Sequence, residues 1–219
     1  MSEASISRNR ADSALGAARE LFDRRRLLVM LTLLLLEVGI FAAGLLTPVS
    51  DNVRQAIEDQ TSAQFASVPS ATPPQLFSFI FVHNLPIALV EMVPLLGAIV
   101  FASSIYVTGV AAQVSAAAQG YPGTFGGVLL IFPFTFVEFA AYAIAVGAGA
   151  MLVYSWIRGR LRREAMVFSF ELGAVAIVLL VAALMETATK FSVLIGLALW
   201  VPTGLAVLGI VAYSWRSGA

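Results

Sequence analysis

The 219-residue sequence contains no cysteine and only one histidine. Without cysteine the chain cannot form disulfides, thiolate metal sites or a cysteine nucleophile. One histidine is too few for the usual zinc sites. Thirteen basic and thirteen acidic residues cancel to a net charge of zero, so no basic excess indicates a nucleic acid as partner. We therefore expect no metal, no cofactor and no nucleic acid.

Charged residues are also scarce, at 12% of the chain, while 59% of the residues are hydrophobic. Soluble domains carry about a quarter charged residues. This composition predicts an all-α, polytopic membrane protein and not a soluble enzyme. An intramembrane enzyme is disfavoured too, because no Gly-x-Ser-x-Gly, His-Glu-x-x-His or paired-aspartate motif is present. We expect no catalytic residues.

Six apolar stretches match the length of about 20 residues that a helix needs to cross the hydrocarbon core. They are predicted at residues 27–47, 76–93, 95–118, 128–157, 167–186 and 191–213. The second and third are joined near Pro94, and one crossing plus a re-entrant hairpin is the alternative for residues 76–118. The spans form one transmembrane domain of residues 27–214, between an N-terminal segment 1–26 and a tail 215–219.

Arginines cluster beside two of these spans and predict the orientation of the chain. Six lie in segment 1–26 and four more in residues 158–163. The positive-inside rule then places both termini in the cytoplasm of a multi-pass plasma-membrane protein. Residues 11–25 are mildly amphipathic, through Leu15, Ala18 and Phe22, and are predicted to lie along the inner surface. Residues 48–74 form an outer loop with a helix-like piece at 51–60.

Four glutamates fall inside the predicted spans: Glu37, Glu91, Glu138 and Glu171. Charged groups at this depth usually face protein or water. No lysine or arginine lies within the spans to pair with them, and desolvation without a cation favours the protonated form of a carboxyl group. Structural hydrogen bonding between helices is the alternative to a functional role, and Glu37 and Glu171 fit that alternative better than the other two.

A pattern, Pro-x-x-x-Val-Glu, occurs twice, at residues 86–91 and 133–138. It indicates either an internal duplication or a chance match in an apolar chain. In both cases it places a carboxyl group about one turn beyond a proline. The candidate intramembrane polar site therefore consists of His83, Asn84, Glu91, Pro133 and Glu138.

Small residues recur where helices can approach closely, and four glycines are predicted to serve helix packing: Gly97, Gly109, Gly147 and Gly149. Packing within the chain is the favoured interpretation, with an interface between two copies as an addition. Separately, Glu186 and Lys190 are four residues apart, which predicts an ion pair on one helix face near the outer boundary.

Several of these residues follow one another in the order of a known family: Asn84, Gly97, Gly109, Pro133 with Glu138, and the stretch 182–186. Over about residues 75–190 the chain resembles the stage II sporulation protein M (SpoIIM) membrane family. Phe134 and Thr135 stand where that family usually has His-Gly. A further span, residues 191–213, follows the part that resembles the family.

The resemblance implies a non-enzymatic scaffold or complex subunit that organises partners at the cell envelope. Founding members of the family hold peptidoglycan-degrading partners at a membrane during sporulation. The buried acids support an alternative, a small transporter or channel that uses Glu91 and Glu138 as a proton, cation or substrate site. Expected partners are the lipid bilayer and other membrane or envelope proteins, with a second copy of the chain as a further candidate.

Overall fold

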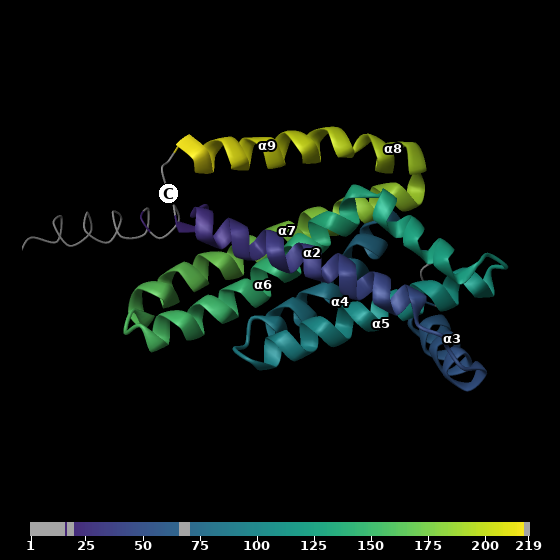
Figure 1. Ribbon diagram of the computed structural model, residues 1–219. Helices are drawn as coiled ribbons and strands as arrows, with labels where there is room; N and C mark the ends of the chain where they lie inside the picture. Colours follow the sequence, from purple (N-terminus) through teal and green to yellow (C-terminus); the bar gives the residue numbers. More distant parts are fainter. Residues whose placement is uncertain (1–15, 17–19, 66–70, 217–219) are drawn as a thin grey trace, which may run out of the picture.

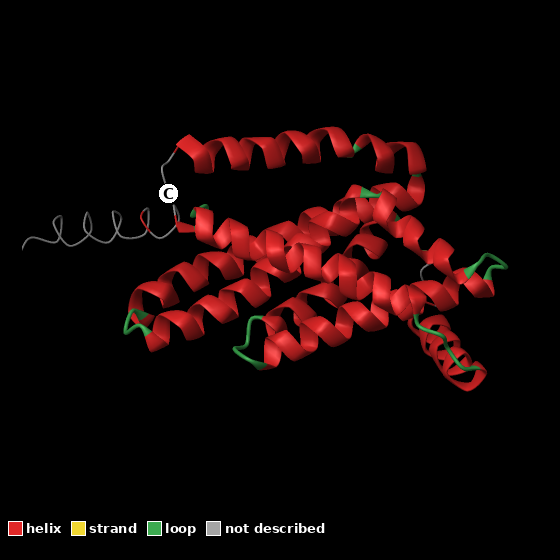
Figure 2. Cartoon of the chain, in the orientation of Figure 1, coloured by secondary structure: helices red, strands yellow, loops and turns green. Residues whose placement is uncertain are grey.

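The computed structural model of the protein describes residues 16, 20–65 and 71–216 (Figure 1). Within these residues the regular structure is entirely helical, with short loops between the helices (Figure 2). The elements are α2 (Arg24–Leu46), α3 (Asp51–Phe65), α4 (Pro73–Glu91), α5 (Leu96–Ala118), the 3₁₀ helix η2 (Gly123–Ile131), α6 (Pro133–Ile157), α7 (Leu161–Phe191), α8 (Val193–Ala198) and α9 (Trp200–Arg216).

In the described part of the chain, six helical stretches are long and apolar enough to cross a membrane. Five are α2, α4, α5, α6 and α7, and the sixth is α8 with α9. The prediction of an all-helical protein with six spans is thus confirmed. Residues 76–118 form two separate helices, each of spanning length. The cytoplasmic location of the termini stays a prediction.

Turn residues set the ends of these helices. Thr72 precedes Pro73, and its backbone N–H donates to the Gln75 side chain at 2.8 Å, which closes a capping box at the start of α4. Pro133 occupies the first turn of α6, where its missing N–H costs nothing. Gly120 and Gly159 follow α5 and α6 with φ of 81° and 69°, the left-handed region that glycine adopts without strain.

Helix α6 is the centre of the bundle. It packs against α7, α2 and α4, and half of its apolar window is buried. In contrast, only 6% of the window over α8 and α9 is buried, and α9 stands apart from the bundle in Figure 1. The rings of Phe22 and Tyr213 meet at 5.5 Å, so the start of α2 and the end of α9 lie at the same end of the molecule.

Helices α2 and α5 cross with their backbones in contact. A Cβ atom on Gly44 would collide with the Tyr106 carbonyl oxygen, and one on Gly109 would collide with the Phe41 carbonyl oxygen. The Gln113 side chain also donates to the Leu45 and Thr47 carbonyls. These contacts fix α5 against the last turns of α2.

The boundaries of several predicted segments were wrong. α2 begins at Arg24, before the predicted start of the first span at residue 27. The predicted span 128–157 begins at Pro133, because residues 123–131 form the 3₁₀ helix. The helical piece of loop 48–74 continues to Phe65. Most of the amphipathic segment 11–25 lies outside the described residues.

Candidate intramembrane carboxyl site

A cavity of about 280 Å³ lies inside the bundle, between α2, α4, α5, α6 and α7. Its polar lining includes His83 and Asn84 on α4, Glu138 and Tyr142 on α6, and Glu186 on α7. Three residues of the predicted polar site, His83, Asn84 and Glu138, therefore line one cavity. The His83 ring stacks on Phe79 with centroids 6.1 Å apart.

Glu138 lies in the second turn of α6. The Tyr142 hydroxyl, one turn further along, donates to its Oε1 at 3.0 Å. Pro133 starts the helix and is fully buried, and Thr135 donates to the Leu129 carbonyl at 2.7 Å. Pro133 thus fixes where α6 begins and, through that, the height of Glu138 in the cavity.

Glu91 is the last residue of α4, so the two Pro-x-x-x-Val-Glu segments occupy different positions in their helices. Its side chain is 1% exposed. The Ser104 hydroxyl, which also lines the cavity, donates to Glu91 Oε1 at 3.1 Å. Glu91 Oε2 is buried and has no hydrogen-bond partner among the described residues.

Glu37, in the middle of α2, completes the group. Its side chain is fully buried, and neither carboxyl oxygen has a partner among the described residues. It lies within electrostatic range of both Glu91 and Glu138. Sequence reasoning assigned Glu37 a structural role, but the hydrogen bonds that such a role requires are not formed. We call Glu37, Glu91, Glu138 and Tyr142, with the cavity beside them, the carboxyl chamber.

The acids of the chamber have no cationic partner among the described residues. No group of three His, Asp or Glu side chains in the described residues is arranged to hold a metal. No ion pair of the described residues involves Glu37, Glu91 or Glu138. A protonated carboxyl donates a hydrogen bond and an ionised one accepts, so each of these acids can take up or release a proton.

A second buried cluster does contain a cation. Arg26 is 4% exposed and donates to Glu164 at 2.5 Å and to Glu171 at 2.6 Å. The Ser155 hydroxyl donates to the other oxygen of Glu164 at 3.1 Å. The expectation that no arginine reaches the acids of the spans was therefore wrong for Glu171. The cause is the boundary of α2, which starts before the apolar run and carries Arg26 into the bundle.

The family model for stage II sporulation protein M matches residues 27–189. The chain belongs to the stage II sporulation protein M family. No curated protein and no solved structure matches it. The SpoIIM match extends from α2 almost to the end of α7, so it includes all of the carboxyl chamber. α8 and α9 lie outside it.

The predicted packing glycines and the predicted ion pair of this SpoIIM-family chain lie at separate points of the bundle. Gly97, in the first turn of α5, packs against the Glu91 carbonyl, and Gly149 on α6 packs against the Met92 carbonyl. Gly147 makes ordinary contacts with α2. Lys190 Nζ lies 3.7 Å from Glu186 Oε1. Glu186 also lines the cavity, so this pair adjoins the chamber.

Proposed function

We propose that this SpoIIM-family protein acts in the plasma membrane as a small transporter or channel subunit that binds and passes protons at the carboxyl chamber. The observation that carries the proposal is Glu37, a fully buried acid with no partner for either oxygen among the described residues. An ionised acid inside a membrane bundle is costly, because the bilayer offers no water to solvate it, and acids retained there commonly mark ion or proton pathways.

The arrangement of the acids supports the same proposal. Glu37, Glu91 and Glu138 come from three different helices and face a common region. Glu186, at the far end of α7, also borders the cavity and acts electrostatically on Glu138. A proton taken up at Glu186 then has Glu138 as its next acceptor, followed by Glu91 or Glu37. No catalytic role is part of the proposal.

The test is proton flux into proteoliposomes that contain the purified protein and a trapped pH-sensitive dye. The wild-type protein should dissipate an imposed pH gradient, and Glu37→Gln and Glu138→Gln should each reduce flux to that of protein-free vesicles. Gln keeps the size of the side chain but cannot exchange a proton. Asp59→Asn, on the exposed face of α3, is the matched control and should keep full flux.

The proposal is wrong if the wild-type protein gives no flux above empty vesicles under either direction of the gradient. It is also wrong if the two Gln variants conduct as well as the wild type. Reconstitution has to be equal in all samples, which quantification of the protein in each vesicle preparation establishes.

A second candidate is the scaffold that the family resemblance implies, and α9 favours it. This helix lies outside the SpoIIM match and contacts the bundle at few points, which include the Trp200 indole N–H donating to the Ile131 carbonyl at 2.7 Å. Val201, Leu205 and Leu208 on α9 are each about two-thirds exposed, at 66–67%. Such a surface is available to a neighbouring membrane protein.

Purification in mild detergent, followed by mass spectrometry, tests the scaffold. The intact protein is compared with a variant in which Val201, Leu205 and Leu208 of α9 are changed to alanine. Stoichiometric partners that this variant loses would support the scaffold and identify its assembly. A homo-oligomer without other proteins in both samples would argue against it and leave the proton site as the proposal.

A further inference from the structure

The turn between α4 and α5 ends well short of the turn between α6 and α7. The Met92 carbonyl oxygen lies 2.8 Å from the position of a Cβ atom on Gly149. Gly149 is eight residues before Ile157, the last residue of α6. At 1.5 Å per residue, α6 continues for about 12 Å beyond this contact. Figure 1 shows the same offset, with the α6–α7 turn projecting beyond the α4–α5 turn.

The α4–α5 turn has the composition of a segment that lies in hydrocarbon. Leu95 is 80% exposed, and Val93 and Leu96 are each nearly half exposed. Most of its backbone N–H groups form local hydrogen bonds. Those of Val93, Leu96 and Gly97 donate to the carbonyls of Val90, Pro94 and Val93, respectively. The start of α2, the end of α6 and the start of α7 therefore extend past α4 and α5 toward the arginine-rich surface.

A recess of about 480 Å³ occupies this projecting end, between the first turns of α2 and the α6–α7 turn. Its apolar wall includes Val29 and Met151, and Tyr154 lies beside them. Arg158 and Arg160 form its rim on the α6–α7 side. Apolar walls below a basic rim are the arrangement found where lipid headgroups bind between membrane helices.

The charges of the recess are only partly neutralised within the protein. Arg26 is held by Glu164 and Glu171, and Arg163 forms an ion pair with Glu20. This leaves Arg25, Arg158 and Arg160 against a single acid of the lining, Asp23, an excess of two positive charges that the second acid of the Arg26 cluster reduces to one. None of these four forms an ion pair with another described residue.

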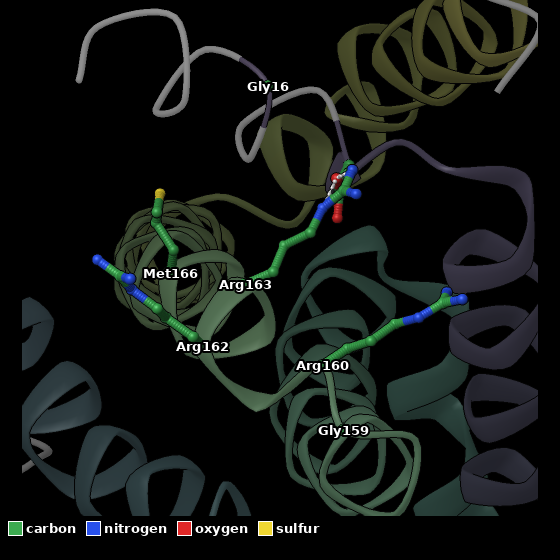
Figure 3. A pocket seen from close by; sticks show the side chains of 7 residues that line it. Gly16, Gly159, Arg160, Arg162, Arg163 and Met166 are labelled. Carbon is green, nitrogen blue, oxygen red and sulfur yellow. Dashed lines mark hydrogen bonds and ion pairs between the residues drawn. The ribbon is translucent and has the colours of Figure 1, made fainter. Parts of the chain in front are cut away.

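The arginines of the α6–α7 turn differ in direction. Figure 3 shows Arg160 pointing toward the α2 side, where the recess lies, while Arg162 points to the opposite side. Arg158 extends over the Tyr154 ring at 5.4 Å. Trp156 and Ile157 are 68% and 75% exposed at the same level. An exposed tryptophan beside arginines is typical of the boundary between hydrocarbon and headgroups.

We propose that this recess binds the phosphate headgroup of an anionic phospholipid, with Arg158 and Arg160 as the ligands of the phosphate. Guanidinium groups bind phosphate oxygens in a bidentate manner, and the two rim arginines approach from one side of the recess. One acyl chain then lies along Tyr154 and Met151, on the part of α6 that α4 and α5 do not reach. The site is separate from the carboxyl chamber and does not depend on a transport function.

The experiment compares lipid retention by native mass spectrometry of the protein released from detergent micelles. The probes are phosphatidylglycerol and phosphatidylcholine with identical acyl chains. The wild-type protein should retain phosphatidylglycerol in preference. Arg158→Gln with Arg160→Gln should weaken this binding by roughly thirtyfold, from the attraction typical of two arginines at a lipid surface.

The matched control is Arg24→Gln with Arg162→Gln, which removes the same charge from exposed arginines outside the recess. This control should keep the preference for phosphatidylglycerol. Equal losses in both double variants would overturn the proposal, because they would show attraction to net charge alone. If the double variant does not fold, the single variant Arg160→Gln takes its place, and a partial loss of phosphatidylglycerol binding is expected.

Inorganic phosphate distinguishes a lipid from a free anion. At millimolar concentration it should leave phosphatidylglycerol bound, because the acyl chains contribute to the affinity of the lipid. Displacement of the lipid by inorganic phosphate alone would overturn the lipid assignment and identify a soluble phosphate as the ligand.

Discussion

The bundle contains two groups of buried acids that differ in how they are neutralised. Near the arginine-rich end, Glu164 and Glu171 share Arg26. In the carboxyl chamber, Glu37, Glu91 and Glu138 receive hydrogen bonds only from Ser104 and Tyr142 among the described residues. The first group is a set of ion pairs that joins α2 to α7. In the second group only Glu91 bonds to another helix, through Ser104 on α5, whereas Glu138 bonds within α6 and Glu37 bonds to none of the described residues.

The largest effect is expected from Arg26→Met, which leaves Glu164 and Glu171 buried without their cation. Loss of one partner in a buried ion cluster lowers the free energy of unfolding by about 3–5 kcal/mol. Unfolding by dodecyl sulfate in mixed micelles, followed by circular dichroism, measures the change. Adding Glu164→Gln and Glu171→Gln to the Arg26→Met variant should restore most of the loss. An unchanged stability of the single variant would contradict the comparison.

The chamber, in contrast, is held by backbone contact between α2 and α5. Gly109→Ala places a methyl group against the Phe41 carbonyl and should lower the free energy of unfolding by about 1–3 kcal/mol. Gly173→Ala is the control, since its Cβ atom meets nothing within 4 Å. The same unfolding assay should show Gly173→Ala to be neutral or stabilising. Equal losses of stability in the two variants would contradict a specific requirement for glycine at the α2–α5 crossing.

One substitution, made in both groups, should have opposite effects. Glu37→Leu removes an unpartnered buried acid and should raise the free energy of unfolding by roughly 1 kcal/mol, because the polar group no longer has to be desolvated. Glu171→Leu removes a partner of Arg26 and should lower it. Thermal unfolding in one detergent compares the two variants directly. A loss of stability at both positions would mean that Glu37 is structural after all.

The smallest effect is expected at the Glu186–Lys190 pair, where Lys190 is 46% exposed. The pair should contribute about 0.3–0.5 kcal/mol, as exposed pairs one helical turn apart do. A double-mutant cycle with Glu186→Gln and Lys190→Gln isolates this coupling. A coupling several times larger would show that the pair belongs energetically to the chamber.

The six spans were predictable from the sequence because hydrophobic length is a local property of the chain. His83, Asn84 and Glu138 were chosen as site candidates from residue type alone, as polar groups in apolar helices, and they line one cavity. The partner of Glu171 was not predictable, because Arg26 is 145 residues away and was assigned to water. Its place depends on where α2 begins.

The contribution of Glu37 was missed for a related reason. The residues next to Glu37 in the sequence do not indicate its neighbours in the folded protein, which come from α4 and α6. Gly44 and Gly109 let α2 and α5 cross closely, and α5 carries Ser104, which donates to Glu91. That contact is a property of the assembled bundle. The 3₁₀ helix η2 was likewise read as a turn followed by the start of a span, because its sequence of glycines and apolar residues carries both signals.

The uncharged turn between α4 and α5 bears on how the chain enters the membrane during synthesis. Basic residues in short loops direct each span, and residues 158–163 carry four of them. Residues 92–95 carry none, so α4 and α5 have no signal of their own at their junction. We therefore expect the two helices to insert as one hairpin, oriented by arginines that are synthesised before and after it.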